Sequence, residues 1–284
     1  MSYNTLCQHY ATSKMYKYTP TWALNWEYRR NVLTREILSY STNIICLQEV
    51  ETRTYEEYWV PLMKEKGYEG VFHCKSRAKT MNEKSAKRVD GLIDKKILEY
   101  GKLVISQEKF KKTEDIFNRF MNKDNIASLS ILNHIGSGQK LAMQVAVLLE
   151  ELQSLVKNYT SGREDINKIP LIIFYQFISQ GVCKNHGDLR DRDYGKYTAE
   201  GLEHPFHLRS AYDVIGELPF TNFTPTFTEV IDYIWYSTPT LSVKGLLGGV
   251  DAEYTDKVIG FPTGDCPSDH IPLLSKFEFK KQAS

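Results

Sequence analysis

Continuous apolar runs along the chain predict buried β-strands, and the clearest of them cover 43–50 and 169–174. Runs of this kind are typical of strands covered on both faces, so we expect helices on each side of them. Shorter strands are predicted over 3–7 and 128–132. Together the segments predict an α/β domain, in which Glu49 closes the run over 43–50.

Apolar residues that recur at helical spacing predict a helix after the first strand. Trp22, Trp26, Leu33 and Ile37 follow one another at intervals of four, seven and four residues. These intervals place all four side chains on one face of a helix that ends near Tyr40. We therefore expect this face to pack against the strand that follows.

Two further helices are predicted from capping and spacing. Thr54 and Glu57 have the spacing of a capping box, which opens a helix that ends before Gly67. From Val145 to Val156, apolar residues step by three and four positions, as expected of an amphipathic helix. The chain thus alternates strands with helices and predicts a single domain.

The last apolar stretches of the chain carry reactive side chains. Val230–Trp235 contains Asp232, and Pro267–Leu274 contains Asp269 and His270. We expect both stretches to be strands, because a buried sheet packs its apolar side chains and presents polar groups at its edge. This arrangement predicts a cleft lined by carboxylates and an imidazole.

Polar residues at the predicted strand ends form a candidate site for phosphate chemistry. They are Asn4, Glu49, Asp232, Asp269 and His270. A hard cation such as Mg²⁺ prefers carboxylate oxygens and keeps bound waters, so one or two acids with a substrate phosphate would hold it. An Asp–His pair could orient water or protonate a leaving group. The alternative is that each acid is a solvated strand end.

Composition limits the functions that the chain can have. With 284 residues and 42% hydrophobic content, it can bury a substantial core. Its 36 basic and 35 acidic residues nearly cancel, so charge alone would not hold a nucleic acid. A polyanion would have to bind locally, in a cleft or through a metal.

The cysteines and the apolar segments indicate a soluble protein of a reducing compartment. The five cysteines are odd in number and share no CxxC spacing, which argues against a disulfide framework and a zinc site. No apolar segment is long enough to span a bilayer, and the first residues lack the features of a signal peptide. We expect an intracellular protein that does not bind a membrane.

A loop dense in aromatic residues, 216–227, precedes the stretch that contains Asp232. Phe223 or Phe227 could stack on a nucleobase while Asn222 binds a base edge, as in proteins that hold single-stranded RNA without a strong net charge. The alternative is that these rings fold back onto the core. The sequence favours neither alternative.

Five segments of the chain carry a family resemblance. They are Ser2–Gln8, Cys46–Val50, Gly216–Phe227, Ile231–Ile234 and Pro267–His270. In these segments the chain resembles the catalytic mRNA deadenylases of the carbon catabolite repressor class, which belong to the exonuclease/endonuclease/phosphatase family. The segments occur in the family's order, and the Gly216–Phe227 loop is specific to this class.

The resemblance implies two stacked mixed β-sheets flanked by helices, in one nuclease-like domain over 1–284. It also implies two Mg²⁺ ions and the removal of poly(A) tails from the 3′ end by an activated water. Glu49 matches the metal-ligand acid, with Asn4 beside it. Asp232 and His270 match catalytic groups on the phosphate, and Asp269 matches a residue that orients His270.

The resemblance further implies that Asn222 and Phe227 contact adenine. Its implied partners are poly(A) RNA and the subunits of a deadenylase complex. Its implied location is the cytoplasm, with the nucleus as a second compartment.

The chain departs from the family at three internal points. The family's Gly-Asp-Phe-Asn motif, which supplies a catalytic Asp, is missing where Ile173 passes to Tyr175. The His-Trp-Asp-Pro strand is missing between Leu141 and Met143, and an apolar strand is missing after Gly91. The family's leucine-rich repeat region, which binds partners, is also absent. We therefore expect a shortened nuclease domain, truncated at its N-terminus, that lacks core strands and has unpaired edges.

Three functions follow from these observations. The first is a Mg²⁺-dependent poly(A) exoribonuclease whose activity is impaired by the missing motifs. The second is an inactive remnant or isoform that binds RNA or a complex partner. The third is a phosphodiesterase that acts on a small nucleotide or lipid, and the Gly216–Phe227 loop argues against it.

Overall fold

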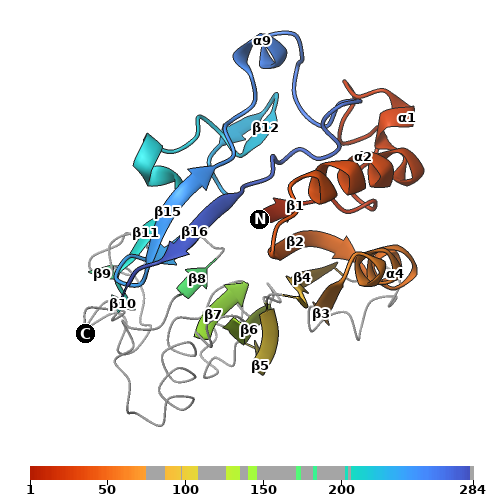
Figure 1. Ribbon diagram of the computed structural model, residues 1–284. Helices are drawn as coiled ribbons and strands as arrows, with labels where there is room; N and C mark the ends of the chain where they lie inside the picture. The colour runs from red at the N-terminus through yellow and green to blue at the C-terminus, as the bar shows by residue number, and fades with distance from the viewer. Residues whose placement is uncertain are drawn as a thin grey trace, which may run out of the picture.

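The computed structural model describes residues 1–74, 87–96, 98–107, 126–134, 140–145, 171–173, 182–183, 202–203 and 206–281. Its strands form two main sheets with helices beside one of them (Figure 1). Both sheets mix parallel and antiparallel pairs, as expected for the fold class. The α/β prediction of two stacked mixed sheets is therefore confirmed.

The first sheet has four strands in the order β1-β2-β4-β3. Their bounds are Ser2–Asn4, Ile44–Glu51, Lys87–Asp94 and Tyr68–Cys74. β1 is parallel to β2, whereas β4 is antiparallel to both β2 and β3. The predicted strands over 3–7 and 43–50 are thus present, and the first of them is shorter than predicted.

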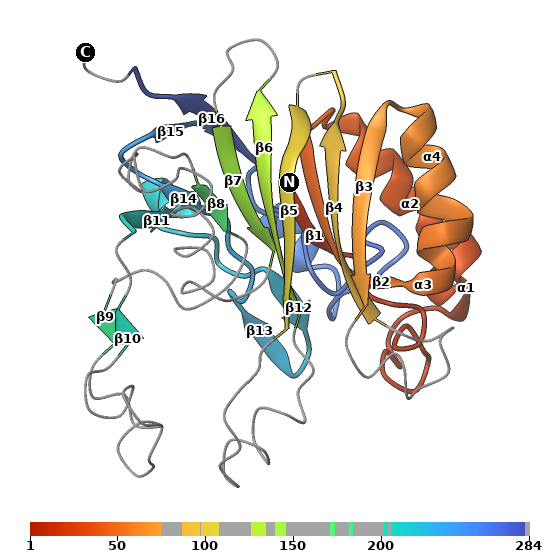
Figure 2. The ribbon, with the colours of Figure 1, turned by 90° about the horizontal axis from the view of Figure 1, so that it is seen from below.

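The helices of the N-terminal half pack along one face of this sheet (Figures 1 and 2). They are α1 (Thr21–Leu24), α2 (Trp26–Ser39), α3 (Thr52–Thr54), the π-helix η1 (Tyr55–Trp59) and α4 (Val60–Glu65). Leu33 and Ile37 of α2 and Trp59 of η1 share a buried cluster with Ile45 and Leu47 of β2. Burial of these side chains is what fixes the helices to the sheet.

The second sheet has six strands in the order β11-β14-β8-β7-β6-β5. Their bounds are Leu208–Ser210, Trp235–Ser237, Leu171–Ile173, Lys140–Val145, Ile126–His134 and Leu98–Gln107. β4 contacts β7 and β3 contacts β6, so the two sheets are stacked (Figure 2). The strand predicted over 128–132 lies within β6.

The remaining described elements are short. They are β9 (Val182–Cys183) with β10 (Leu202–Glu203), β12 (Asn222–Thr224) with β13 (Phe227–Glu229), β15 (Leu241–Leu246) with β16 (Ser275–Phe279), the 3₁₀-helix η6 (Tyr212–Ile215) and α9 (Ala252–Thr255). Of the helices in the described ranges, none is long and apolar enough to cross a membrane.

The two faces of β2 have different neighbours. Ile45 and Leu47 face the helices, whereas Cys46 packs in a second cluster with Ile271 and Leu273 of the C-terminal segment. The prediction of helices on both faces was therefore wrong for β2. A continuous apolar run reports burial on both faces, but it does not distinguish a helix from another layer of strands.

The predicted face of the first long helix is partly wrong. Asn25 has an extended backbone (ψ 134°) and caps α2, because its side chain accepts a hydrogen bond from Glu27 N at 2.8 Å. The cap separates α1 from α2, and Trp22 is 56% exposed instead of lying on the buried face. The end of α2 near Tyr40 is as predicted.

The capping box at Thr54 does not form. The helical segment already begins at Thr52, and the Thr54 hydroxyl donates to Glu51 O at 2.9 Å. Glu57 instead forms an ion pair with Arg53. The segment ends before Gly67, which has φ +88°, and this end agrees with the prediction.

The apolar stretches around the candidate site are not ladder strands over their full length. In Val230–Trp235 only Trp235 belongs to β14. Pro267–Leu274 makes isolated bridges, in which His270 pairs with Asn222 and Leu273 pairs with Ser2. The apolar pattern here reflects burial. A continuous strand does not form, because the two bridges join this segment to two different partners.

The strands that flank the missing segments are paired on both sides. β4 lies between β2 and β3, β7 between β6 and β8, and β8 between β7 and β14. The expected unpaired edges are thus not found at these strands, because their neighbours supply backbone partners. The turn-like Val89–Gly91 lies inside β4. Of the predicted helix Val145–Val156, Val145 ends β7 and the rest lies outside the described residues.

Candidate functional site

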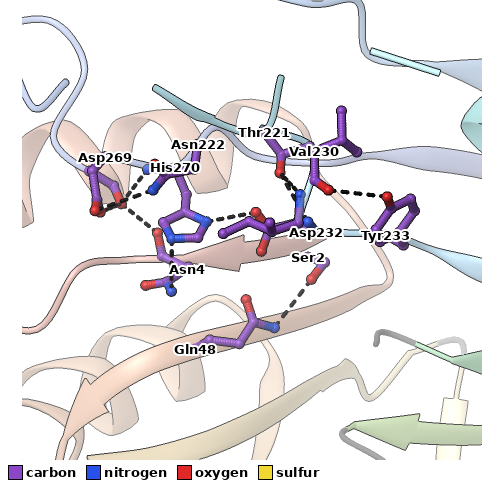
Figure 3. A network of polar contacts seen from close by, with 12 residues as sticks. Ser2, Asn4, Gln48, Thr221, Asn222, Val230, Asp232, Tyr233, Asp269 and His270 are labelled. Carbon is purple, nitrogen blue, oxygen red and sulfur yellow. Dashed lines mark hydrogen bonds and ion pairs between the residues drawn. The ribbon is translucent and has the colours of Figure 1, made fainter. Parts of the chain in front are cut away.

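The predicted site residues His270 and Asp232 form a hydrogen-bonded pair. His270 Nδ1 lies 2.6 Å from Asp232 Oδ2, and the two side chains are 11% and 20% exposed (Figure 3). Asp232 is held in place by its own backbone, because Asp232 N donates to Thr221 Oγ1 at 2.9 Å. A carboxylate on Nδ1 fixes the ring orientation and leaves Nε2 as the nitrogen that can exchange a proton with a substrate.

Asn4 faces the other ring nitrogen. Its Nδ2 lies 3.3 Å from His270 Nε2, and its Oδ1 accepts a hydrogen bond from Leu6 N at 3.1 Å. Because Leu6 N–H is a donor, it fixes the amide with the oxygen toward Leu6 and the NH₂ toward the imidazole. This arrangement suits a neutral ring that carries its proton on Nδ1.

Asp269 has a different role from the one predicted. Its Oδ2 accepts hydrogen bonds from Tyr16 OH at 2.9 Å and from Asn222 Nδ2 at 3.3 Å. The carboxylate on the His270 ring is Asp232, so the expectation that Asp269 orients His270 was wrong. The chain bends at Ser268 and Asp269, and the hydrogen bonds to Tyr16 and Asn222 hold the Asp269 carboxylate in its own position.

Burial and the neighbouring charges shift the pKa of His270 in opposite directions. Burial opposes the imidazolium, but the hydrogen bond and the charge of Asp232, with Asp269 and Glu49 further away, outweigh it and raise the pKa of His270. Burial and the charge of Asp269 also raise the pKa of Tyr16. Tyr16 therefore remains a hydrogen-bond donor to Asp269 at any physiological pH.

Glu49 sits at an irregular point of β2. The register of β2 against β4 shifts between Gln48 and Val50, and Glu49 in between has φ +61°. Bulges re-aim side chains beside active sites, and a left-handed backbone at a non-glycine residue marks stored strain. The carboxylate Oε2 accepts a hydrogen bond from Cys7 N at 3.2 Å, so Glu49 supports the loop that follows Asn4.

The oxygen donors of the site fit a hydrated magnesium ion better than an all-protein cage. Mg²⁺ binds through one or two carboxylates and keeps several waters. Glu49 supplies one such carboxylate, and its charge is felt at His270 and Tyr16. Within the described ranges, no three His, Cys, Asp or Glu side chains lie close enough to hold a metal by themselves.

The aromatic loop divides into a buried part and an exposed part. Phe223 stacks on Phe220 with ring centroids 5.0 Å apart and packs in the core cluster. Phe227, in the β12–β13 hairpin, is 45% exposed. Asn222 is 5% exposed and donates to Asp269. The core alternative therefore holds for Phe223, whereas base contacts by Phe227 and Asn222 stay predictions.

Sequence reasoning missed two residues that join the site. Tyr16 binds Asp269, and the Ser268 hydroxyl donates to Asn4 O at 2.7 Å. Ser268 is completely buried. Its position beside the Asp-His pair was a usable signal, whereas Tyr16 lies in a polar loop without periodicity and gave none.

Comparisons with known proteins bear on the class of this fold. No protein-family model matches the chain. Solved structures of the exonuclease/endonuclease/phosphatase fold do: ANGEL2, described as a 2′,3′-cyclic phosphatase, has a TM-score of 0.75 at 19% identity over 97% of this chain and 93% of its own. The human Nocturnin catalytic domain has a TM-score of 0.62 at 22% identity over 98% and 92%.

Curated sequences narrow the class further. The subunit Ccr4 of Candida albicans, a CCR4-Not complex 3′-5′-exoribonuclease, is 52% identical over 99% of this chain and 41% of its own length. Ccr4 of Saccharomyces cerevisiae is 48% identical over 99% and 38%. The chain therefore has the exonuclease/endonuclease/phosphatase fold and is similar to the Ccr4 subunits over nearly its whole length, and it spans about two fifths of these relatives.

The alignments also bear on the internal departures. The alignment with the Candida albicans protein extends over 322 positions, whereas the chain has 284 residues. At least 38 positions of that relative thus have no counterpart here. The chain therefore aligns with this Ccr4 sequence with internal deletions.

Proposed function

We propose that the chain is the nuclease region of a Mg²⁺-dependent 3′-5′ exoribonuclease that shortens poly(A). The observation that carries the proposal is the hydrogen-bonded series Asn4–His270–Asp232, which joins β1, the C-terminal segment and the segment before β14 (Figure 3). A buried imidazole with a carboxylate on Nδ1 is suited to move a proton at a phosphodiester. The names of the Ccr4 relatives support this reaction class.

The residues of the chain would act on different parts of the phosphodiester. His270 Nε2 faces the reacting phosphate as proton donor or acceptor, and Asp232 holds the ring and stabilises its charged form. Asn4 directs its amide N–H toward the same place and can donate to a phosphate oxygen. Glu49 would hold Mg²⁺, which when bound supplies charge stabilisation to the phosphate oxygens.

Poly(A) is the proposed substrate, and Phe227 is its proposed stacking platform. Phe227 is 45% exposed on the β12–β13 hairpin, and the same hairpin begins with Asn222 beside Asp269. Stacking of a base on an aromatic ring contributes about 1–3 kcal/mol per base and does not need a strong net charge. This agrees with the nearly neutral chain.

We propose further that turnover is weak. The Gly-Asp-Phe-Asn and His-Trp-Asp-Pro motifs are missing, so a second acid and a second imidazole are not supplied at their usual places. The alternative function is an inactive module that binds RNA or a subunit of a deadenylase complex. The missing Asp, Asn and His of these motifs favour this alternative.

An exonuclease assay tests the first function directly. Purified chain, Mg²⁺ and a 5′-labelled oligo(A) should yield a ladder of shortened products, slower on oligo(U), and Glu49→Ala should abolish it. Robust shortening that survives Glu49→Ala would point to a contaminating nuclease. Rapid shortening abolished by Glu49→Ala would contradict weak turnover.

Calorimetry separates the two functions. If the nuclease site operates, adenosine monophosphate should bind only when Mg²⁺ is present, and Glu49→Ala should remove this dependence. An inactive module predicts binding of RNA without any such coupling. The proposed location, cytoplasmic with a nuclear share, follows from the expected role in mRNA decay and is testable with a tagged chain.

A further inference from the structure

Helix α2 carries a buried arginine on the face that packs toward the site. Arg29 is 0% exposed and is buried together with Val32, Leu33 and Ile37 of the same helix. An arginine is rarely buried completely unless its charge and its five N–H donors have partners. The groups that accept hydrogen bonds from Arg29 therefore indicate its role.

The partners are backbone carbonyls from two loops that are far apart in sequence. Arg29 Nη2 donates to Thr5 O at 2.5 Å and to Leu6 O at 2.6 Å, and Nε donates to Pro267 O at 2.7 Å. A fourth contact reaches Gln8 Oε1 at 3.4 Å. The planar guanidinium thus bridges the loop after β1 and the start of the C-terminal segment.

Both bridged segments carry a residue of the site. Thr5 follows Asn4 directly, and Pro267 lies three residues before His270. The Ser268 hydroxyl adds a second tie between the segments, because it donates to Asn4 O at 2.7 Å. The distance of 3.3 Å between Asn4 Nδ2 and His270 Nε2 is measured across the same two segments.

The loop that Arg29 holds is in an unfavourable conformation. Leu6 has φ +52°, a left-handed backbone that costs free energy at a non-glycine residue and persists only when its surroundings impose it. Its carbonyl accepts from Arg29, and its N–H donates to Asn4 Oδ1 at 3.1 Å. The arginine therefore binds the same residue whose N–H orients the Asn4 amide.

We propose that Arg29 is a positioning residue, whose buried guanidinium clamps Thr5, Leu6 and Pro267 and so sets the relative position of Asn4 and His270. The proposal deepens the proposed function, because it assigns the clamp to that nuclease site. Burial lowers the pKa of Arg29 to about 10, partly offset by Tyr3 and Asp269. The guanidinium therefore keeps its charge and its donors at neutral pH.

The spacing of α2 contains the signal that would have found this residue. Trp26, Leu33 and Ile37 define the apolar face, and position 29 lies three residues after Trp26 and four before Leu33. A charged residue at that position is a departure from the helical pattern. Such a departure on a buried face indicates a partner in the core.

The experiment uses the NMR signal of the His270 imidazole, assigned by its loss in His270→Gln. Arg29→Met keeps the aliphatic part of the side chain and removes the guanidinium group. Arg29→Lys keeps the positive charge, but its single ammonium group cannot bind both loops at once. Arg35→Met changes an exposed arginine of the same helix and serves as the control. Circular dichroism reports whether each variant folds.

In Arg29→Met and Arg29→Lys, we expect the chemical shift of the His270 imidazole to move to the value that it has in Asn4→Ala. In Arg35→Met, we expect the chemical shift to stay unchanged. Low concentrations of the guanidinium ion, which fits the space of the guanidinium group lost in Arg29→Met, should restore the original signal. In an active chain, kcat should fall about 100-fold with little change in KM, as for a misplaced catalytic group. A folded Arg29→Met with an unchanged His270 signal would overturn the proposal.

A measurement on the unmodified chain covers the case in which the variants do not fold. The guanidinium protons of Arg29 should exchange with solvent far more slowly than those of Arg35, and equal exchange would refute the clamp. If the chain shows no nuclease activity while His270 still responds to Arg29, the clamp stands and the proposed reaction fails. The two proposals are thus tested separately.

Discussion

Replacing Asp232 by asparagine tests the pair at the centre of the site. Asp232→Asn keeps the size of the side chain and an acceptor for His270 Nδ1, but removes the negative charge. The pair is short, at 2.6 Å, and its side chains are only 11% and 20% exposed, so water weakens the attraction little. The variant therefore isolates what the charge contributes.

The expected magnitude follows from the kind of hydrogen bond that is lost. A hydrogen bond to a charged group contributes about 1.5–3 kcal/mol and a neutral one about 0.5–1.5 kcal/mol. Asp232→Asn should therefore lower the free energy of unfolding by roughly 1–2 kcal/mol when His270 is protonated. The pKa of His270 should also fall, because Asp232 is the neighbour that raises it most.

The loss depends on pH with a definite sign. Since the folded protein raises the pKa of His270 above its unfolded value of about 6.5, the stabilisation is fully present below that value. It disappears as the pH rises through the higher folded-state pKa. The variant should therefore lose more stability at about pH 6 than at about pH 9.

Urea unfolding followed by tryptophan fluorescence measures the difference, because Trp59 and Trp235 are buried. Asp213→Asn is the matched control: it also removes one carboxylate, but from a half-exposed ion pair with Arg209, where water screens the charges and a much smaller loss is expected. A loss for Asp232→Asn that is as large at about pH 9 as at about pH 6 would refute the reasoning.

Three further substitutions, one of them with a matched control, test the packing and the helix cap that support the site. Trp59→Ala removes a ring that is 1% exposed and should lower the free energy of unfolding by about 3–5 kcal/mol; a loss below about 1 kcal/mol would contradict its place in the core. Asn25→Ala removes the cap of α2 and should cost about 0.5–2 kcal/mol in urea unfolding. Gly260→Ala should lower the free energy of unfolding by about 1–3 kcal/mol, because its Cβ would lie 2.8 Å from Pro225 Cδ. In the control Gly248→Ala the new Cβ meets no atom within 4 Å, so its loss should be smaller by at least about 1 kcal/mol.

The sequence correctly predicted those helices and strands whose buried residues follow one regular pattern. The strand at Ile44–Glu51 and the end of α2 near Tyr40 lie where the apolar pattern places them. Hydrophobic periodicity reports burial, and burial decides these elements. The pattern failed at Trp22, because a cap at Asn25 interrupts the helix within a single residue.

The resemblance of short segments supplied the site residues, and the structure supplied their pairing. Asn4, Asp232 and His270 come together as a hydrogen-bonded series, although they lie in three segments far apart in sequence. That His270 pairs with Asp232 and not with the adjacent Asp269 depends on the fold, which brings Asp232 to the imidazole and brings Tyr16 and Asn222 to the Asp269 carboxylate. Sequence adjacency contains no such information.

By itself the sequence determined the class of fold and the identity of the groups that can do chemistry, because these depend on local patterns and residue types. Only the tertiary structure decided which groups touch. No pattern of side chains reveals the backbone carbonyls of Thr5, Leu6 and Pro267. These carbonyls nevertheless accept the hydrogen bonds that allow an arginine to be buried on the apolar face of α2. A buried charge is stable only where distant segments bring acceptors to it, and that condition is satisfied by the whole fold.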